Sequence, residues 1–333
     1  MLDKGCSGIT KFQNDWTILR RLRKRRLVIK MTENTPKDRA NREELVAILR
    51  SKCKVDGENS IVEGMNFYRH SKPTQPFHGL YSPSICIIAQ GAKEVQMGDE
   101  RFRYDPANFL LCSLDVPVVS QVVEASDRKP FLGLKFDLDP ALIASVSVES
   151  GVAPGRNDAS VRSIAVTSLD GELLDAFVRL FRLVDNSCDY RMLSPLVVRE
   201  IVYRLLRSEQ GPRLQQMATF AGNTNRITRA VQTLRTRYNE ALSIESLAHD
   251  LGMSVSSFHQ HFKTATSMSP LQFQKLLRLQ EARRLLLAED LDAGSVAAKV
   301  GYDDASQFNR EYKRHFGLPP MRDVAMMRQS VAS

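Results

Sequence analysis

Cysteine and histidine are the residues of this chain best able to hold a metal, and their spacing argues against a metal site. The five cysteines are odd in number, widely spaced and without a C-x-x-C pair: Cys6, Cys53, Cys86, Cys112 and Cys188. Neither a zinc site nor a disulfide framework is therefore predicted. His259 and His261 are two residues apart, but in a helix such neighbours point about 200° apart and cannot chelate one ion. We expect no metal, no cofactor, and reduced thiols, with Cys86 and Cys112 buried in apolar runs.

Basic residues are the second group with obvious chemistry. The 333 residues carry a net charge of +9, and +7 of it falls in residues 1–30. A charge block of this kind cannot bury itself, so we interpret it as a disordered leader, with Met31 as the true start, or as an arm that touches nucleic acid or anionic lipid. No secretory signal and no membrane span of roughly 18 apolar residues is present. We expect a cytoplasmic protein.

The chain is long enough for two domains, and its first half is β-prone. Six short runs are separated by turn residues at the spacing of a barrel or sandwich: 84–90, 93–97, 100–104, 108–113, 116–123 and 131–136. Two histidines, His70 and His78, are expected to precede these strands. Five aromatic residues are candidates to line an effector pocket, although a core role is expected for each: Phe77, Tyr81, Phe102, Tyr104 and Phe109.

Helical periodicity follows the strands. Asp139-Pro140 is an N-cap followed by proline at the first helical position, and Ser194-Pro195 is read as the start of a later helix. Apolar residues recur at three- and four-residue steps in 173–184 and 196–206. These two stripes pack either against a second copy, giving a homodimer, or against the barrel of their own chain. The periodicity lapses at 210–223, which predicts an interdomain linker.

The last hundred residues contain one set of parts twice. A helix-turn-helix needs a small residue where its helices cross, a glycine four residues later, and a capped second helix with an apolar inner face. The first set is Ala248, Gly252, Ser254, Phe258 and Phe262, and the second is Ala297, Gly301, Asp303 or Asp304, Phe308, Tyr312 and Phe316. The near-constant offset between them predicts two helix-turn-helix units.

A predicted helix over residues 271–287, capped by Ser269-Pro270, connects the two units. At about 1.5 Å per residue it forms a rod of about 25 Å. Successive major grooves lie about 34 Å apart on one face of B-DNA. The rod is therefore a suitable spacer for two recognition helices.

These residues carry a resemblance. The stretch from about Asn225 to Arg322 resembles the DNA-binding domain of the AraC/XylS family of bacterial transcription regulators, in the segments 241–248, 262–263, 269–270, 283–286, 300–302 and 316–320. Residues 80–140 resemble, more loosely, the cupin-like N-terminal effector domain of one AraC-type subgroup. The resemblance implies an α+β protein with a cupin-like effector and dimerisation domain at 31–209, a double helix-turn-helix domain at 224–322 and a tail at 323–333.

The resemblance also implies a function. A small-molecule effector binds the barrel, the helices bind double-stranded promoter DNA, and the family leans toward activation through contact with RNA polymerase. Family positions that contact DNA correspond here to Ser256, His259, Gln260, Lys263, Ser306, Gln307, Asn309, Arg310, Lys313 and Arg314. Arg310 suits a bidentate contact with guanine, and Gln260 or Asn309 suits adenine. His261 departs from the family's apolar residue and is expected to be half-buried.

Cupins also include metal-dependent enzymes, which place two histidines on a strand with one residue between them, the same His-x-His spacing as His259 and His261. No such pair occurs in the β-prone segment. We therefore expect a protein that is not an enzyme. The alternative is a metal-independent cupin-type enzyme, or a ligand-binding protein, with an accessory helical domain.

Overall fold

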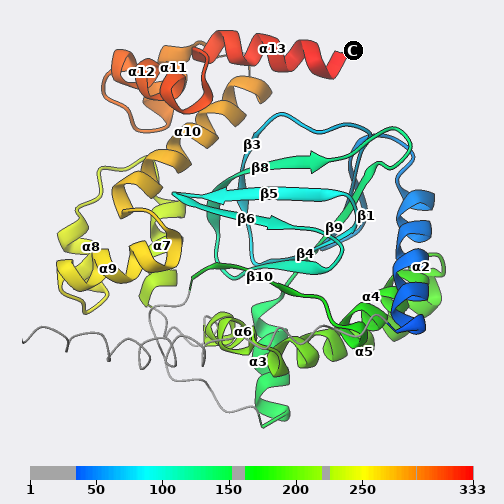
Figure 1. Cartoon of the computed structure of the whole chain (residues 1–333). Coiled ribbons are helices and arrows are strands. Elements are labelled where there is room, and N and C mark those ends of the chain that lie inside the picture. Colours follow the sequence, from blue (N-terminus) through cyan, green and yellow to red (C-terminus); the bar gives the residue numbers. More distant parts are fainter. Residues whose placement is uncertain (1–34, 152–161, 220–225, 290, 333) are drawn as a thin grey trace, which may run out of the picture. The chain divides into compact units, whose positions relative to one another are not determined.

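The computed structural model describes residues 35–151, 162–219, 226–289 and 291–332, so the predicted leader lies outside the described residues. Helix α2 (Pro36–Lys52) comes first (Figure 1). The strands that follow are β1 (Gly57–Val62), β2 (Met65–His70), β3 (Phe77–Tyr81), β4 (Ser84–Gln90), β5 (Ala92–Met97), β6 (Glu100–Tyr104), β7 (Asn108–Cys112), β8 (Val116–Glu124) and β9 (Phe131–Asp137). The next elements are α3 (Pro140–Glu149), β10 (Ile164–Ser168), α4 (Gly171–Leu183), α5 (Ser187–Arg207) and α6 (Gly211–Thr219).

The remaining described elements are helices. They are α7 (Arg226–Thr236), α8 (Ile244–Asp250), α9 (Val255–Thr266), α10 (Pro270–Ala288), α11 (Ala293–Lys299), α12 (Ala305–Phe316) and α13 (Pro320–Ala332). A two-sheet β domain followed by a helical C-terminal domain confirms the predicted fold class. Within the described ranges, no helix is both long and apolar enough to cross a membrane.

The strands form two antiparallel sheets. The larger has the order β1-β2-β9-β4-β7-β10, and the smaller has the order β3-β8-β5-β6. Strand β4 is apolar from Ile85 to Ala89, as expected of a strand with both faces buried. Ile85 and Ile87 pack toward the helices, whereas Cys86 and Ile88 pack toward the smaller sheet. The second cluster holds the cavity described below.

All six predicted strands are present with nearly the predicted bounds, as β4 to β9. Four further strands were not predicted: β1, β2, β3 and β10. Three of these lie at sheet edges, where one side of the strand stays unpaired and polar residues are tolerated. His70 and His78 precede the six predicted strands, as expected, but they lie in two of the strands that were not predicted, since His70 ends β2 and His78 lies in β3.

Helix α4 covers the larger sheet of its own chain, and α5 packs on α4. The apolar stripe of α4, from Leu173 to Phe181, is buried in the same cluster as Ile201, Leu205 and the strand residue Phe67. The Phe67 and Phe181 rings meet edge to face at 5.6 Å. For the residues of these helices that are buried in this cluster, the structure supports the second interpretation, packing within their own chain.

Two helix boundaries differ from the prediction. Helix α5 begins at Ser187 with Asn186 as its N-cap, so Pro195 lies inside the helix and does not start it. The predicted linker covers residues 210–223, but most of its first part forms helix α6 (Gly211–Thr219). This helix packs on α3 and buries Leu214 and Met217. The prediction of a helix start at Asp139-Pro140 is confirmed, since the Asp139 carboxylate accepts a hydrogen bond from the Ala141 amide at 2.8 Å.

Candidate functional site

The first helix-turn-helix consists of α8 and α9. The chain turns between them at Gly252, whose φ is 62°. The Ser254 hydroxyl caps α9 by accepting a hydrogen bond from the Ser257 amide at 3.2 Å. The Phe258 and Phe262 rings are fully buried, with their centroids 5.6 Å apart. These contacts confirm the predicted parts of the first unit.

The second unit consists of α11 and α12. Its turn glycine, Gly301, has a φ of 86°, and a Cβ there would lie 2.1 Å from the Asn239 carbonyl oxygen. Only glycine fits here, because it tolerates the positive φ and has no Cβ to collide with this oxygen. Asp304 and not Asp303 is the N-cap, because its carboxylate accepts hydrogen bonds from the Ser306 and Gln307 amides at 2.8 and 3.1 Å. These amides hold the pKa of Asp304 below its usual value.

Helix α10 joins the two units as a rod of 19 residues, about 28 Å long. Arg278 in the middle of this helix connects both units. Its guanidinium donates to the carbonyl oxygens of Tyr238 at 2.7 Å, Glu240 at 2.9 Å and Gly301 at 2.7 Å. Because one planar group meets three backbone acceptors, the turn of the second unit is held in a fixed position relative to the segment that leads into α8 of the first.

The residues predicted to contact DNA lie on the outer faces of α9 and α12. Nine of the ten are exposed, and His259 is half-buried: Ser256, Gln260, Lys263, Ser306, Gln307, Asn309, Arg310, Lys313 and Arg314. The Arg310 guanidinium lies 3.9 Å from the Asp304 carboxylate. His261 is half-buried, as predicted. The two exposed faces therefore carry the side chains that base and phosphate contacts require.

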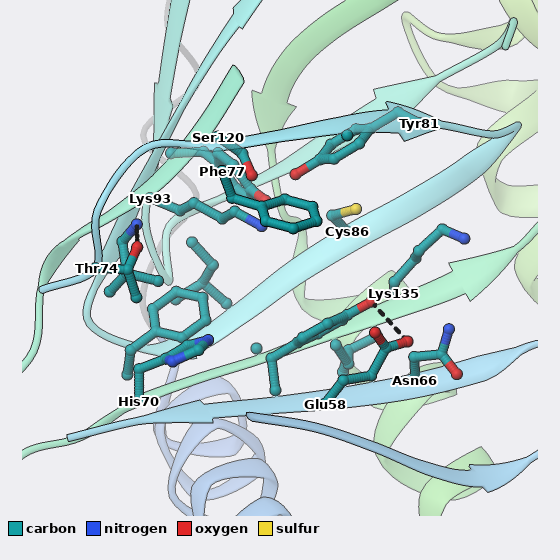
Figure 2. Close-up of a pocket in the computed structure, with 18 of the residues that line it drawn as sticks. Glu58, Asn66, His70, Thr74, Phe77, Tyr81, Cys86, Lys93, Ser120 and Lys135 are labelled. Atoms are coloured by element: carbon teal, nitrogen blue, oxygen red, sulfur yellow. Dashed lines mark hydrogen bonds between the residues drawn. The ribbon is translucent and has the colours of Figure 1, made fainter. Parts of the chain in front are cut away.

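A cavity of about 580 Å³ lies in the β domain, lined by residues of several strands (Figure 2). Three of the five aromatic candidates, Phe77, Tyr81 and Tyr104, line it, although a core role was expected for each. Phe109 does not, because it is fully buried in the cluster on the other side of the larger sheet. Phe102 also does not, since it packs partly buried against the second cluster.

Lys93 is the cavity residue that the sequence interpretation missed. Its amino group lies 5.7 Å from the centroid of the Tyr68 ring and 5.6 Å from that of Tyr81. Although burial lowers the pKa of Lys93, the neighbouring Tyr81 hydroxyl and the other groups around it raise it above its usual value overall. A signal was present in the sequence: Lys93 shares one face of β5 with the buried Val95 and Met97, because residues two apart in a strand face the same way.

The other titratable groups of the cavity are neutral or paired. Burial raises the pKa of the Cys86 thiol and of the Tyr104 phenol, so neither provides an anion. Burial lowers the pKa of His70. Lys135 is paired with Asp137 at 2.7 Å. In the part of the chain that the structure describes, no group of three or more His, Cys, Asp or Glu side chains is placed to hold a metal ion.

Strand β3 lies between the cavity and the DNA-binding helices. Phe77 and Tyr81 line the cavity, whereas His78 meets the second unit, with its Nδ1 3.1 Å from Nε2 of His315. The side chain of Gln280, in α10, donates to the Gly79 carbonyl oxygen at 3.0 Å. Burial lowers the pKa of both His78 and His315 to about 4, so both imidazoles are neutral at pH 7.

The first unit is also fixed to the β domain. The Ser163 hydroxyl donates to the Ala265 carbonyl oxygen at 2.7 Å, and Ser267, which follows α9, donates to the Glu100 carboxylate at 2.8 Å. Ser267 has a φ of 58°, and it is the one residue other than glycine with positive φ in the described ranges. These contacts hold the C-terminal end of α9 against β6, through Glu100, and against the start of β10, through Ser163.

The paired helix-turn-helix units and the separate cavity domain define a DNA-binding regulator. Residues 61–213 match the family model described as AraC-type transcriptional regulator N-terminus, and residues 247–324 match a helix-turn-helix domain model. The chain belongs to the AraC-type transcriptional regulators, which confirms the resemblance noted in its sequence.

Individual relatives are distant in sequence. The thermoregulatory protein LcrF of Yersinia pestis is 22% identical over 245 residues, 73% of this chain and 87% of the relative. The transcriptional activator RhaS of Escherichia fergusonii is 28% identical over 131 residues, 38% of this chain and 46% of the relative. Among solved structures, ToxT of Vibrio cholerae is similar with a TM-score of 0.46 and 12% identity, over 79% of this chain and 96% of that one.

Proposed function

We propose that α9 and α12 bind two successive major-groove segments of promoter DNA and read them by direct contacts. The observation that carries this proposal is the pair of exposed polar faces held on one rigid α10 through Arg278. Arg310 is assigned to a guanine and Gln260 to an adenine. Lys263, Lys313 and Arg314 are assigned to phosphates.

Footprinting of the purified chain on the intergenic region beside its own gene tests this assignment. We expect protection of two segments one helical turn apart for each protomer. A single protected segment would contradict the use of both units. Arg128→Ala is the matched control for the Arg310→Ala variant described in the Discussion. Arg128 is an exposed arginine of the β8–β9 loop, so its loss removes one positive charge away from both recognition helices.

We infer that the cavity binds a small-molecule effector and that β3 carries its effect to the helices. The support is the position of β3, which lines the cavity with Phe77 and Tyr81 and contacts α10 and α12 with Gly79 and His78. A ligand that displaces β3 acts on the second unit directly, because the same short strand forms both surfaces. We propose that the effector domain extends through α6, since Leu214 and Met217 belong to its core.

The chain is further proposed to act as a homodimer and as an activator that contacts RNA polymerase. The outer face of α5 supports the first point, because Met192, Leu196 and Tyr203 are 68%, 63% and 43% exposed there. Exposed apolar side chains on one helix face are typical of association surfaces. We also propose that the chain has no enzymatic activity, which is supported by the regulatory function of its relatives.

A further inference from the structure

The effector cavity contains one ammonium group without a carboxylate partner. Lys93 extends into it beside the Phe77 ring and the Cys86 thiol (Figure 2). No carboxylate of the described residues forms an ion pair with it, whereas Lys135, at the same cavity, is paired with Asp137 at 2.7 Å. Glu58 is the one acidic residue among the lining side chains, and its carboxylate instead accepts a hydrogen bond from the Tyr68 hydroxyl at 3.2 Å.

A buried ammonium is costly unless it is paired, because it gives up its hydration. The Tyr68 and Tyr81 rings offset part of this cost through their electron-rich faces. The lining groups that would otherwise supply a negative charge, the Cys86 thiol and the Tyr104 phenol, stay protonated at pH 7 because burial raises their pKa values. The Tyr81 hydroxyl and, through space, the Glu58 carboxylate keep Lys93 protonated, but no anionic group contacts its ammonium directly.

The rest of the cavity is largely apolar. Leu80, Ile88, Val122, Phe131 and Leu134 contribute to its wall. Its volume of about 580 Å³ lies within the range of about 300–1,000 Å³ that is usual for small-molecule sites. A ligand that fills this space must be mostly apolar, and an anionic group on it can contact Lys93 directly.

We propose that the effector is an organic monoanion, whose negative group pairs with Lys93 and whose apolar body fills the cavity. A neutral polar ligand such as a sugar leaves the ammonium unpaired and the apolar wall poorly matched. A cationic ligand is repelled. The inference rests on the proposed function only in that it calls the ligand an effector, since the binding itself is independent of DNA.

Two fluorescent probes with the same ring framework test the proposal on the full chain. The first, 8-anilinonaphthalene-1-sulfonate, carries one negative charge, and the second, N-phenyl-1-naphthylamine, is its uncharged counterpart. We expect the wild type to bind the sulfonate at least about tenfold more tightly than the amine, the factor that corresponds to a modest charge-assisted contact. Equal affinities, or no binding of the sulfonate, would overturn the proposal.

Variants locate the charge that is responsible. Lys93→Met is expected to lose at least about tenfold in affinity for the sulfonate and to keep its affinity for the amine. Lys129→Met, which removes an exposed lysine of the β8–β9 loop, is the matched control and is expected to change neither. A loss of sulfonate binding that follows Lys135→Met and not Lys93→Met would also contradict the assignment.

Thermal unfolding without any probe separates a binding role from a structural one. The cost of burying the ammonium and its contacts with the surrounding groups oppose each other, so the Lys93→Met variant is expected to keep its Tm within a few degrees of the wild type. A larger fall in Tm would mean that Lys93 supports the fold and would overturn the proposal. DNA binding by the wild type is measured separately by mobility shift and tests the proposed regulatory function. A failure of the anion-binding proposal therefore does not imply a failure of the proposed DNA binding, and the reverse also holds.

Discussion

The imidazoles of His78 and His315 lie 3.1 Å apart, Nδ1 to Nε2, although 237 positions separate them in the chain. One nitrogen must donate and the other accept, so this hydrogen bond exists only while at least one ring is neutral. The His78 ring also meets the Phe316 ring edge to face at 5.0 Å. Strand β3, which lines the cavity, and helix α12 are thus joined by a contact that depends on protonation.

The first prediction concerns pH. Burial lowers the pKa of both histidines to about 4, below the unfolded value of about 6.5. Between these values the unfolded chain binds more protons than the folded chain, so stability falls as pH falls from about 6.5 to 4. The variant with both His78→Gln and His315→Gln is expected to lose less stability over this interval, by on the order of 2 kcal/mol after allowance for solvent screening.

Urea unfolding at pH 7 and pH 5 measures this difference. His70 has a lowered pKa as well, but it is unchanged in the variant and contributes the same background to both proteins. Identical losses of unfolding free energy in the wild type and the double variant would contradict the role of the pair.

The second prediction distinguishes two glycines that have the same place in the sequence pattern. Gly252 and Gly301 both have positive φ, but a Cβ on Gly252 would meet only the end of the Arg226 side chain at 3.9 Å, whereas one on Gly301 would collide with the Asn239 backbone. Gly252→Ala is expected to cost about 1 kcal/mol in unfolding free energy, from backbone conformation alone. Gly301→Ala is expected to cost more than about 2 kcal/mol. Equal losses in denaturant titrations would show that Asn239 moves aside.

These two glycines also show how far sequence reasoning reaches. Spacing identified both turns and both inner faces, because a helix-turn-helix imposes strict local demands on small, glycine and aromatic residues. The central strands were equally predictable, since burial on both faces makes β4 a continuous apolar run. Ser194-Pro195 was misleading because proline is tolerated at a helix start and, less often, inside one.

The cavity was predicted less well, for a physical reason. Phe109 and Tyr104 look alike in sequence, yet Phe109 lies in β7 of the larger sheet and faces the helices, whereas Tyr104 lies in β6 of the smaller sheet and lines the cavity. The side of each strand that faces the cavity is decided by the packing of the two sheets, which the sequence does not show. Lys93 was overlooked because a lysine in a strand is usually solvent-exposed. Its apolar neighbours on the same face, Val95 and Met97, were the available signal.

The third prediction concerns Arg278, whose guanidinium donates to three carbonyl oxygens. Arg278→Ala leaves these acceptors unsatisfied and is expected to cost about 2–3 kcal/mol in unfolding free energy. It also frees the two units from each other. We expect the affinity for a full DNA site to fall at least about tenfold, with binding to an isolated half-site little changed.

Arg278→Lys is the informative comparison for this prediction, because an ammonium cannot reproduce the planar arrangement of the guanidinium. Full affinity in the alanine variant would mean that α10 alone fixes the spacing.

The fourth prediction separates base contacts from phosphate contacts. Arg310→Ala and Gln260→Ala are expected to lower discrimination at particular base pairs, by about 1–3 kcal/mol each. Lys313→Ala is expected to weaken binding to all sequences equally and to reduce the salt dependence by about one phosphate contact. Mobility shifts over a set of single-base operator variants and several salt concentrations measure both effects. Uniform weakening by Arg310→Ala would reassign that residue to the backbone.

The fifth prediction concerns the outer face of α5. Leu196 is 63% exposed there, between Met192 and Tyr203, whereas the opposite face of the helix is buried against α3, α4 and α6. If the exposed face binds a second copy, Leu196→Glu places two charges in an apolar interface, which such interfaces tolerate poorly. Sedimentation velocity is expected to show a dimer for the wild type and a monomer for this variant. Val148→Glu is the control, because Val148 is 82% exposed on α3 and is not part of the α5 face. A wild type that sediments only as a monomer, both free and on its DNA site, would exclude this interface, and a dimer that survives Leu196→Glu would place the interface on another surface.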